Sequence, residues 1–150
     1  MAVTLCRADI FDAHYSLDRS RTFFHSSSYT ANPIACAAAL ANLEIWANEP
    51  VLERIAAITR LHAQGLERFR DDRRFANVRQ IGTIAALDIV SGDAGYLAAI
   101  GPRLYQDFLS RNLLVRPLGN TIYIMPPYCS GENELGQVYD TLADIADDCL

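Results

Sequence analysis

The sequence contains no lysine, because all thirteen basic residues among its 150 are arginines. Chemistry that needs a lysine amine, such as a Schiff base with a carbonyl cofactor, is therefore excluded for this chain alone. Positive charge is not in excess either, since eighteen acidic residues bring the net charge to −5. A chain of this charge offers no electrostatic footprint for nucleic acid or an anionic membrane surface, and we expect neither as a partner.

Long apolar runs and clustered cysteines are also missing. No stretch reaches the length of a membrane-spanning helix, and the N-terminus has no basic segment followed by an apolar one, as a secretory signal would. The cysteines at positions 6, 36, 129 and 149 are scattered, with no C-x-x-C pair and no histidine at metal-ligand spacing. We therefore expect reduced thiols in a cytoplasmic protein and no metal site.

The chain has enough apolar residues to form a folded core. Half of its residues (51%) are hydrophobic and only 21% are charged, which excludes a disordered chain. Its length suits one ordinary domain or one lobe of a larger protein.

The spacing of apolar residues predicts strands and helices in alternation, and so an α/β fold. The expected elements are a strand at 1–6, a buried apolar helix at 33–46, an amphipathic helix at 51–70, a strand at 78–90 with Gly82 as a bulge, a helix at 96–112, a hairpin of 113–117 with 121–127, and a last helix opening at 131–133. The part from about residue 76 is expected to form a small sheet with helices on one face.

One polar stretch leads directly into a helix start. Residues 25–40 read HSSSYTANPIACAAAL, where Asn32 is a good N-cap and Pro33 suits the first helical position. A hydroxyl-rich loop before a helix is a place that can hold an anion such as phosphate. The alternative is that the serines only form a turn and Asn32 only caps the helix.

A second stretch, VRPLGNTIYIMPPY at 115–128, places an arginine inside an apolar run. The guanidinium of Arg116 can bind a carboxylate through two parallel hydrogen bonds and stays charged, so it is a candidate substrate-binding group. The alternative is an extended side chain whose head pairs with a nearby acid. Tyr123 is either a second pocket residue or an ordinary half-buried aromatic of a strand.

These two stretches together resemble the class III family of pyridoxal-phosphate-dependent aminotransferases. The segment 23–45, FFHSSSYTANPIACAAALANLEI, is similar to the family pattern H-x-x-[ST]-[FY]-x-x-N-P-x-[AS]-C-A-A-A, and 115–128 is similar to R-P-x-G-x-x-I-Y-x-M-P-P-Y, which is typical of one branch of the family. The first residues, MAVTLCRADIF, resemble the strand that follows the family's catalytic lysine. The resemblance therefore covers essentially the whole chain.

The resemblance implies an α/β chain that is the C-terminal part of a fold-type I transferase, with residues 1–47 as the end of the large cofactor-binding domain, 48–75 as a connecting helix and 76–150 as the small domain. It implies a homodimer with pyridoxal 5'-phosphate at the subunit interface and small-molecule substrates. The lysine that holds the cofactor and the aspartate that pairs with its ring nitrogen would both precede Met1.

The same resemblance implies roles for five residues. Ser28, with Ser27 beside it, would contact the phosphate of the cofactor belonging to the other subunit. Arg116 would bind the substrate carboxylate, and Tyr123 and Ser26 would line the substrate pocket. No residue of this chain is expected to be catalytic, since the missing lysine moves the protons.

Two other interpretations stay open. The parent enzyme could be a different class III aminotransferase, with an ω-amino acid or a polyamine as amino donor. Alternatively, the chain could be a non-catalytic α/β interaction module or a gene remnant. In every case we expect the isolated chain to be inactive in transamination, because it has no lysine.

Overall fold

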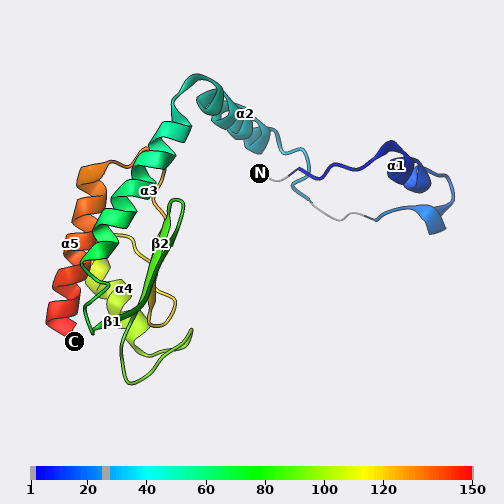
Figure 1. The fold of residues 1–150 in the computed structure, drawn as a ribbon. Coiled ribbons are helices and arrows are strands. Elements are labelled where there is room, and N and C mark those ends of the chain that lie inside the picture. The colour runs from blue at the N-terminus through cyan, green and yellow to red at the C-terminus, as the bar shows by residue number, and fades with distance from the viewer. Residues whose placement is uncertain (1–2, 25–27, 150) are drawn as a thin grey trace. The chain divides into compact units, whose positions relative to one another are not determined.

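The computed structural model describes residues 3–24 and 28–149, and the chain divides into two compact units, Met1–Glu49 and Pro50–Leu150 (Figure 1). Each unit is described by itself below. No helix among the described residues is both long enough and apolar enough to cross a bilayer.

The first unit contains three helical segments: α1 (Ala8–His14), the short 3-10 helix η1 (Arg19–Arg21) and α2 (Pro33–Asn48). The start of α2 is set by its cap, because the side-chain oxygen of Asn32 accepts the backbone N–H groups of Ile34 and Ala35 at 3.0 and 3.1 Å. Pro33 occupies the first turn, where its missing N–H costs no hydrogen bond. The predicted helix start is confirmed.

Two expectations for this unit are wrong within this chain. Residues 3–6 form no strand, because a strand needs a neighbour to hydrogen-bond, and the described strands all belong to the second unit. Helix α2 is apolar as expected but contains no buried residue, and Ile34 is 80% exposed. No second layer covers this helix within residues 3–24 and 28–49, so the predicted burial is not met there.

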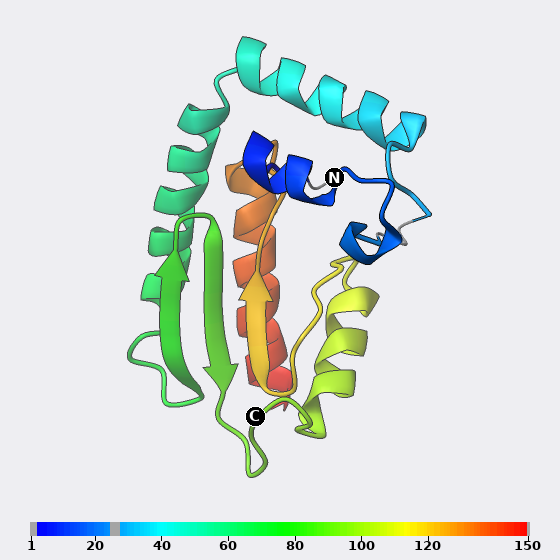
Figure 2. The same cartoon turned by 90° about the vertical axis from the view of Figure 1, so that its right-hand side faces the viewer.

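The second unit is a small three-stranded sheet covered on one face by helices, as the sequence predicts. Its elements are α3 (Val51–Glu67), β1 (Phe75–Ile81), β2 (Ile84–Ile89), α4 (Ile100–Ser110), β3 (Thr121–Ile124) and α5 (Glu132–Cys149). The strands pair antiparallel in the order β1-β2-β3. Figure 2 shows α3 and α5 behind the strands and α4 beyond the outer edge of β3.

The core of the second unit follows from strand alternation. Ala85, Leu87 and Ile89 of β2 are buried, while the residues between them are not. These side chains pack in one cluster with apolar residues of all three helices. The other large apolar side chains that are fully buried in this core are Phe69, Phe108, Ile58, Leu66, Leu104, Ile122, Leu142 and Ile145. The helices and the sheet therefore close over a single apolar layer.

Two strand predictions are corrected here. The segment 78–90 is not one bulged strand but part of a hairpin, in which Ile81 pairs with Ile84 and Gly82 turns the chain at a φ of +53°. The segment 113–117 forms no ladder with 121–127, and only an isolated bridge joins Leu118 to Thr121. Pro117 has no N–H to donate, which prevents a regular ladder at that point.

His62 of α3 lies inside this core, with 0% of its surface exposed. The Thr83 carbonyl can only accept, so the Nε2–H of His62 donates to it at 3.1 Å. Nδ1 then accepts the hydroxyl of Tyr139 at 2.6 Å. Burial lowers the pKa of His62, partly opposed by the Thr83 carbonyl, because the charged ring would lose water without gaining a negative partner.

This buried histidine predicts acid sensitivity of folding. Unfolded His62 binds a proton near pH 6.5, whereas the folded form resists it, so its contribution is fully present above about pH 6.5 and is lost as the pH falls. We expect the urea midpoint of the full chain to drop between about pH 7 and 5. A His62→Gln variant should lose most of that slope, and parallel pH curves for the two proteins would contradict the prediction.

Candidate functional site

The segment that carries Arg116 is extended and alternates between core and surface. Val115 is buried and Leu113 packs against the core, while Leu114 and Arg116 face outward. This alternation is what an extended backbone produces when every second side chain is apolar and anchored. The anchoring of Val115 therefore directs the guanidinium of Arg116 away from the core.

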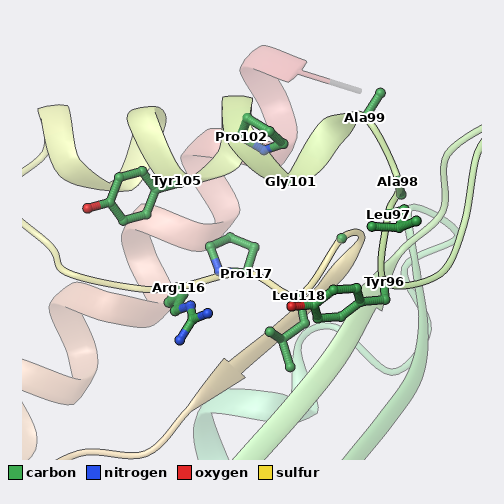
Figure 3. A pocket seen from close by; sticks show the side chains of 11 residues that line it. Tyr96, Leu97, Ala98, Ala99, Gly101, Pro102, Tyr105, Arg116, Pro117 and Leu118 are labelled. Atoms are coloured by element: carbon green, nitrogen blue, oxygen red, sulfur yellow. The ribbon is translucent and has the colours of Figure 1, made fainter.

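Arg116 lines a hollow of about 530 Å³ between this segment and α4, which we name the α4 hollow. Its walls include Tyr96, Tyr105, Pro117 and Leu118. In Figure 3 the side chains of Tyr105 and Pro117 lie above Arg116, and those of Tyr96 and Leu118 lie to the right of it. Arg116 itself is exposed, so its guanidinium is accessible at the rim of a hollow with aromatic and aliphatic walls.

Arg116 also lines a second hollow of about 380 Å³ beside β3, the β3 hollow, which contains Tyr123. Ile122 and Ile124 of β3 are buried, so Tyr123 between them faces the other way and is half-buried. The structure therefore brings together Arg116 and Tyr123, two of the predicted substrate-binding residues. The other walls of the β3 hollow are mainly apolar, among them Leu114, Met125 and Pro126.

The charge on Arg116 is not neutralised within the described part of the chain. It makes no hydrogen bond or ion pair with residues 3–24 or 28–149, in contrast to Arg111, which pairs with Asp148 at 2.6 Å. The one acid beside it in the β3 hollow, Glu134, accepts the backbone N–H of Gly131 at 2.9 Å. Backbone N–H groups, its own and that of Gly131, hold the pKa of the Glu134 carboxyl below its usual range.

An unpaired guanidinium beside apolar walls is suited to one ligand chemistry. It can bind a carboxylate bidentately, and the walls can receive the aliphatic part of the same molecule. The alternative reading, an arginine paired with a local acid, finds no such acid among the described residues.

The hydroxyl-rich loop of the first unit is only partly described. Ser26 and Ser27 lie outside the described residues, whereas Ser28 is exposed in the turn that precedes Asn32. Asn32 already accepts the N–H groups of Ile34 and Ala35, so these donors of α2 are used within the chain. The Ser28 hydroxyl makes no hydrogen bond with the described residues, and its chemistry as a short donor fits a phosphate.

Sequence reasoning missed several residues around Arg116. Tyr96 and Tyr105 line the α4 hollow together with Arg116. The side chain of Asn120 connects the backbone at Gly95 to the backbone at Ile89. The helical spacing of 96–112 gave no signal for the two tyrosines, because they look like ordinary positions of an amphipathic helix. Asn120 has the signal of a turn residue, after Gly119, but its side-chain partners are distant in sequence.

No metal centre is found in the described ranges, where no group of three or more histidine, cysteine or acidic side chains is placed to hold an ion. Cys6, Cys36 and Cys129 are free thiols. The two hollows beside Arg116 and the loop at Ser28 are the candidate sites that contain residues predicted from the sequence.

The sequence matches known aminotransferases along nearly its whole length. The family described as Aminotransferase class-III matches residues 1–146. The adenosylmethionine-8-amino-7-oxononanoate aminotransferase of Synechococcus elongatus is 39% identical over 148 residues, which are 99% of this chain and 34% of that protein. The enzyme of the same name from Aquifex aeolicus is 30% identical over 95% of this chain and 33% of that protein.

Solved structures give the same result. The fold is similar to that of the adenosylmethionine-8-amino-7-oxononanoate aminotransferase of Methanocaldococcus jannaschii, with a TM-score of 0.76 and 28% identity over 86% of this chain and 31% of that one. An omega transaminase of Pseudomonas jessenii in complex with PMP has a TM-score of 0.74 and 26% identity over 85% of this chain and 29% of that one. The chain spans about a third of the length of these relatives.

Proposed function

This chain belongs to the class III aminotransferases, and from that premise we propose that it forms the C-terminal part of a pyridoxal-phosphate-dependent aminotransferase of biotin biosynthesis. The proposed reaction transfers the amino group of S-adenosylmethionine to 8-amino-7-oxononanoate. The names of the relatives that align over 95% or more of the chain support this choice. The observation that carries it is that Arg116, which has no partner among the described residues, shares a mainly apolar hollow with Tyr123.

In this proposal Arg116 holds the carboxylate of the acceptor through its guanidinium fork. The apolar walls of the β3 hollow exclude water from the aliphatic chain of the acceptor, which strengthens the ion pair. Tyr123 lies against the same molecule and limits where its amino-bearing end can lie. These residues bind and orient the substrate, and neither of them transfers a proton.

The cofactor contact is proposed for the loop of the first unit. Ser28 would donate its hydroxyl to the phosphate of pyridoxal 5'-phosphate, with Ser27 beside it and Ser26 nearer the substrate. When bound, the cofactor supplies the electron-withdrawing ring that makes amino transfer feasible. We propose that this phosphate belongs to the other subunit of a homodimer, and that the protein works in the cytoplasm with its thiols reduced.

The proposed domain assignment follows from the same family relation. Residues 1–47 would complete the large domain, and residues 76–150 would be the small α/β domain. Residues 48–75 would form the helix that connects these two domains. The exposed apolar face of α2 supports the first part, since such a helix is stable only when covered. The chain alone is expected to be inactive because it has no lysine.

A second candidate is an omega-type transaminase, favoured by the structural likeness to the Pseudomonas jessenii enzyme. Its 26% identity is lower than the 39% identity to the biotin-pathway relative, which favours the first proposal. The two candidates share the fold and differ in the substrates that the whole enzyme accepts.

A chimera tests the proposal directly. If this chain replaces the matching third of the Synechococcus elongatus enzyme, the chimera should restore growth without biotin to a bacterium that lacks this aminotransferase. Arg116→Leu in the chimera should lower kcat/KM for the acceptor about a hundredfold, because a charged group loses its partner in a partly dry site. Activity with ω-amino acid donors and no activity on the biotin-pathway acceptor would favour the second candidate.

The matched control is Arg103→Leu on α4. Arg103 is 59% exposed and lies 3.8 Å from Asp107 one helical turn away, so its loss should change kcat/KM by less than about twofold. An Arg116→Leu chimera as active as the Arg103→Leu chimera would contradict the role of Arg116.

A further inference from the structure

Asn120 joins three backbone segments through one buried side chain. It is 7% exposed, and its Oδ1 accepts the N–H of Gly95 at 2.8 Å while its Nδ2 donates to the carbonyl of Ile89 at 2.9 Å. Its own backbone carbonyl accepts the N–H of Ile89 at 2.8 Å. The end of β2, the loop after it and the turn before β3 are therefore tied at one residue.

Two of these three segments, the loop after β2 and the turn before β3, lead into the two walls of the α4 hollow. Gly95 immediately precedes the wall that begins at Tyr96, and Asn120 closes the turn that follows Arg116. Figure 3 shows these walls meeting where Tyr96 lies beside Leu118. A movement of Gly95 relative to Asn120 would thus change the width of the hollow where Tyr96 and Leu118 meet, and would shift the turn that follows Arg116.

The turn itself has little freedom. Leu118 and Thr121 exchange two backbone hydrogen bonds at 2.8 and 3.1 Å, and the hydroxyl of Thr121 donates to Asp88 at 2.8 Å. Gly119 between them packs against the Gly95 carbonyl so closely that no side chain fits. Arg116 therefore enters the hollow from a backbone that is fixed on one side by the core and on the other by Asn120.

We propose that Asn120 is a positioning residue for Arg116, and that its amide sets how well the guanidinium receives a carboxylate. This inference rests on the proposed function, in which Arg116 binds the substrate carboxylate. Bidentate binding needs the fork in place to within about half an ångström. The amide supplies a donor for Ile89 and an acceptor for Gly95 from one short side chain, whereas alanine leaves both backbone groups without that partner.

The experiment follows carboxylate binding to the full chain by NMR. Hexanoate is titrated against the Nε–Hε signal of Arg116, which is assigned by its loss in Arg116→Leu, and hexylamine serves as the probe without a carboxylate. Asn120→Ala should weaken hexanoate binding about tenfold, and the amide of Gly95 should lose its protection from hydrogen exchange. Hexylamine should leave the Arg116 signal unchanged in both proteins.

Gln80→Ala is the matched control. The Gln80 amide also ties two backbone segments, donating to the carbonyls of Thr59 at 2.7 Å and Gly82 at 3.0 Å, but it does not line either hollow. Its removal should lower stability without changing hexanoate affinity. If Asn120→Ala does not fold, Asn120→Asp keeps an acceptor for Gly95 but places a charged oxygen against the Ile89 carbonyl in place of the donor, and about threefold weaker binding is expected.

The outcomes separate the two claims. If hexanoate leaves the Arg116 signal of the unaltered chain unchanged, the role of Arg116 in the proposed function fails, and this inference fails with it. If hexanoate binds through Arg116 but the Asn120 variant binds it equally well, only the inference is overturned. Equal weakening in the Asn120 and Gln80 variants also overturns it, since general loosening would then explain the loss.

Discussion

Replacing Gly119 by alanine is expected to destabilise the second unit by about 3 kcal/mol or more, as measured by urea unfolding of the full chain. A Cβ at this position would lie 1.8 Å from the carbonyl oxygen of Gly95 and 2.9 Å from the carbonyl carbon of Tyr96. Both contacts are with backbone, which cannot rotate away as a side chain would. The φ of +61° adds a further cost for any L-residue with a Cβ.

Gly82→Ala separates the two causes. Gly82 has nearly the same backbone conformation, with a φ of +53°, but a Cβ there would meet no atom within 4 Å. This control should therefore cost only about 1 kcal/mol, the price of the left-handed conformation. Equal destabilisation by the two substitutions would show that the contact between Gly119 and Gly95 is looser than described.

The second large effect is expected for Gly65→Ala on α3, although alanine normally stabilises a helix relative to glycine. A Cβ at Gly65 would lie 2.2 Å from Cε2 and 2.3 Å from Cδ2 of the Tyr139 ring. That ring is buried, its hydroxyl donates to His62, and its centroid lies 6.2 Å from the centroid of the Phe69 ring. Because any shift of the ring would disturb its hydrogen bond to His62 and its contact with Phe69, we expect a loss of about 2 kcal/mol.

Gly136→Ala on α5 is the matched substitution, since a Cβ there would meet no atom within 4 Å. It should raise the free energy of unfolding by up to about 1 kcal/mol through helix propensity. Urea unfolding should thus give opposite signs for the two glycine-to-alanine changes in helices. A stabilising Gly65→Ala would contradict the packing of Tyr139 against α3.

The parts of the fold that could be predicted are those with local causes. Asn32 and Pro33 act on the first turn of their own helix, so the start of α2 needs no knowledge of the rest of the chain. The amphipathic patterns of 51–70 and of the last helix are likewise local, and both helices are present. The hairpin at Gly82 was missed because the residue after it, Thr83, is not a usual turn former.

The candidate site shows the same division. Arg116 was found from its immediate neighbours and from the family pattern, and it lines both hollows with no partner among the described residues. Tyr105 and Asn120 were not found, because their importance depends on segments that are far apart along the chain. The same holds for His62, whose partners Thr83 and Tyr139 come from two other elements.

By itself the sequence determined that this chain has no lysine amine for covalent catalysis, where its helices form, and to which family it belongs. Those properties depend on residue identity, on periodicity and on motifs within a few residues of each other. Only the tertiary structure decided that Arg116 and Tyr123 share a hollow and that Asn120 ties its walls. Hydrogen bonds and packing between distant segments have no local pattern, because each partner is defined only when the chain has folded.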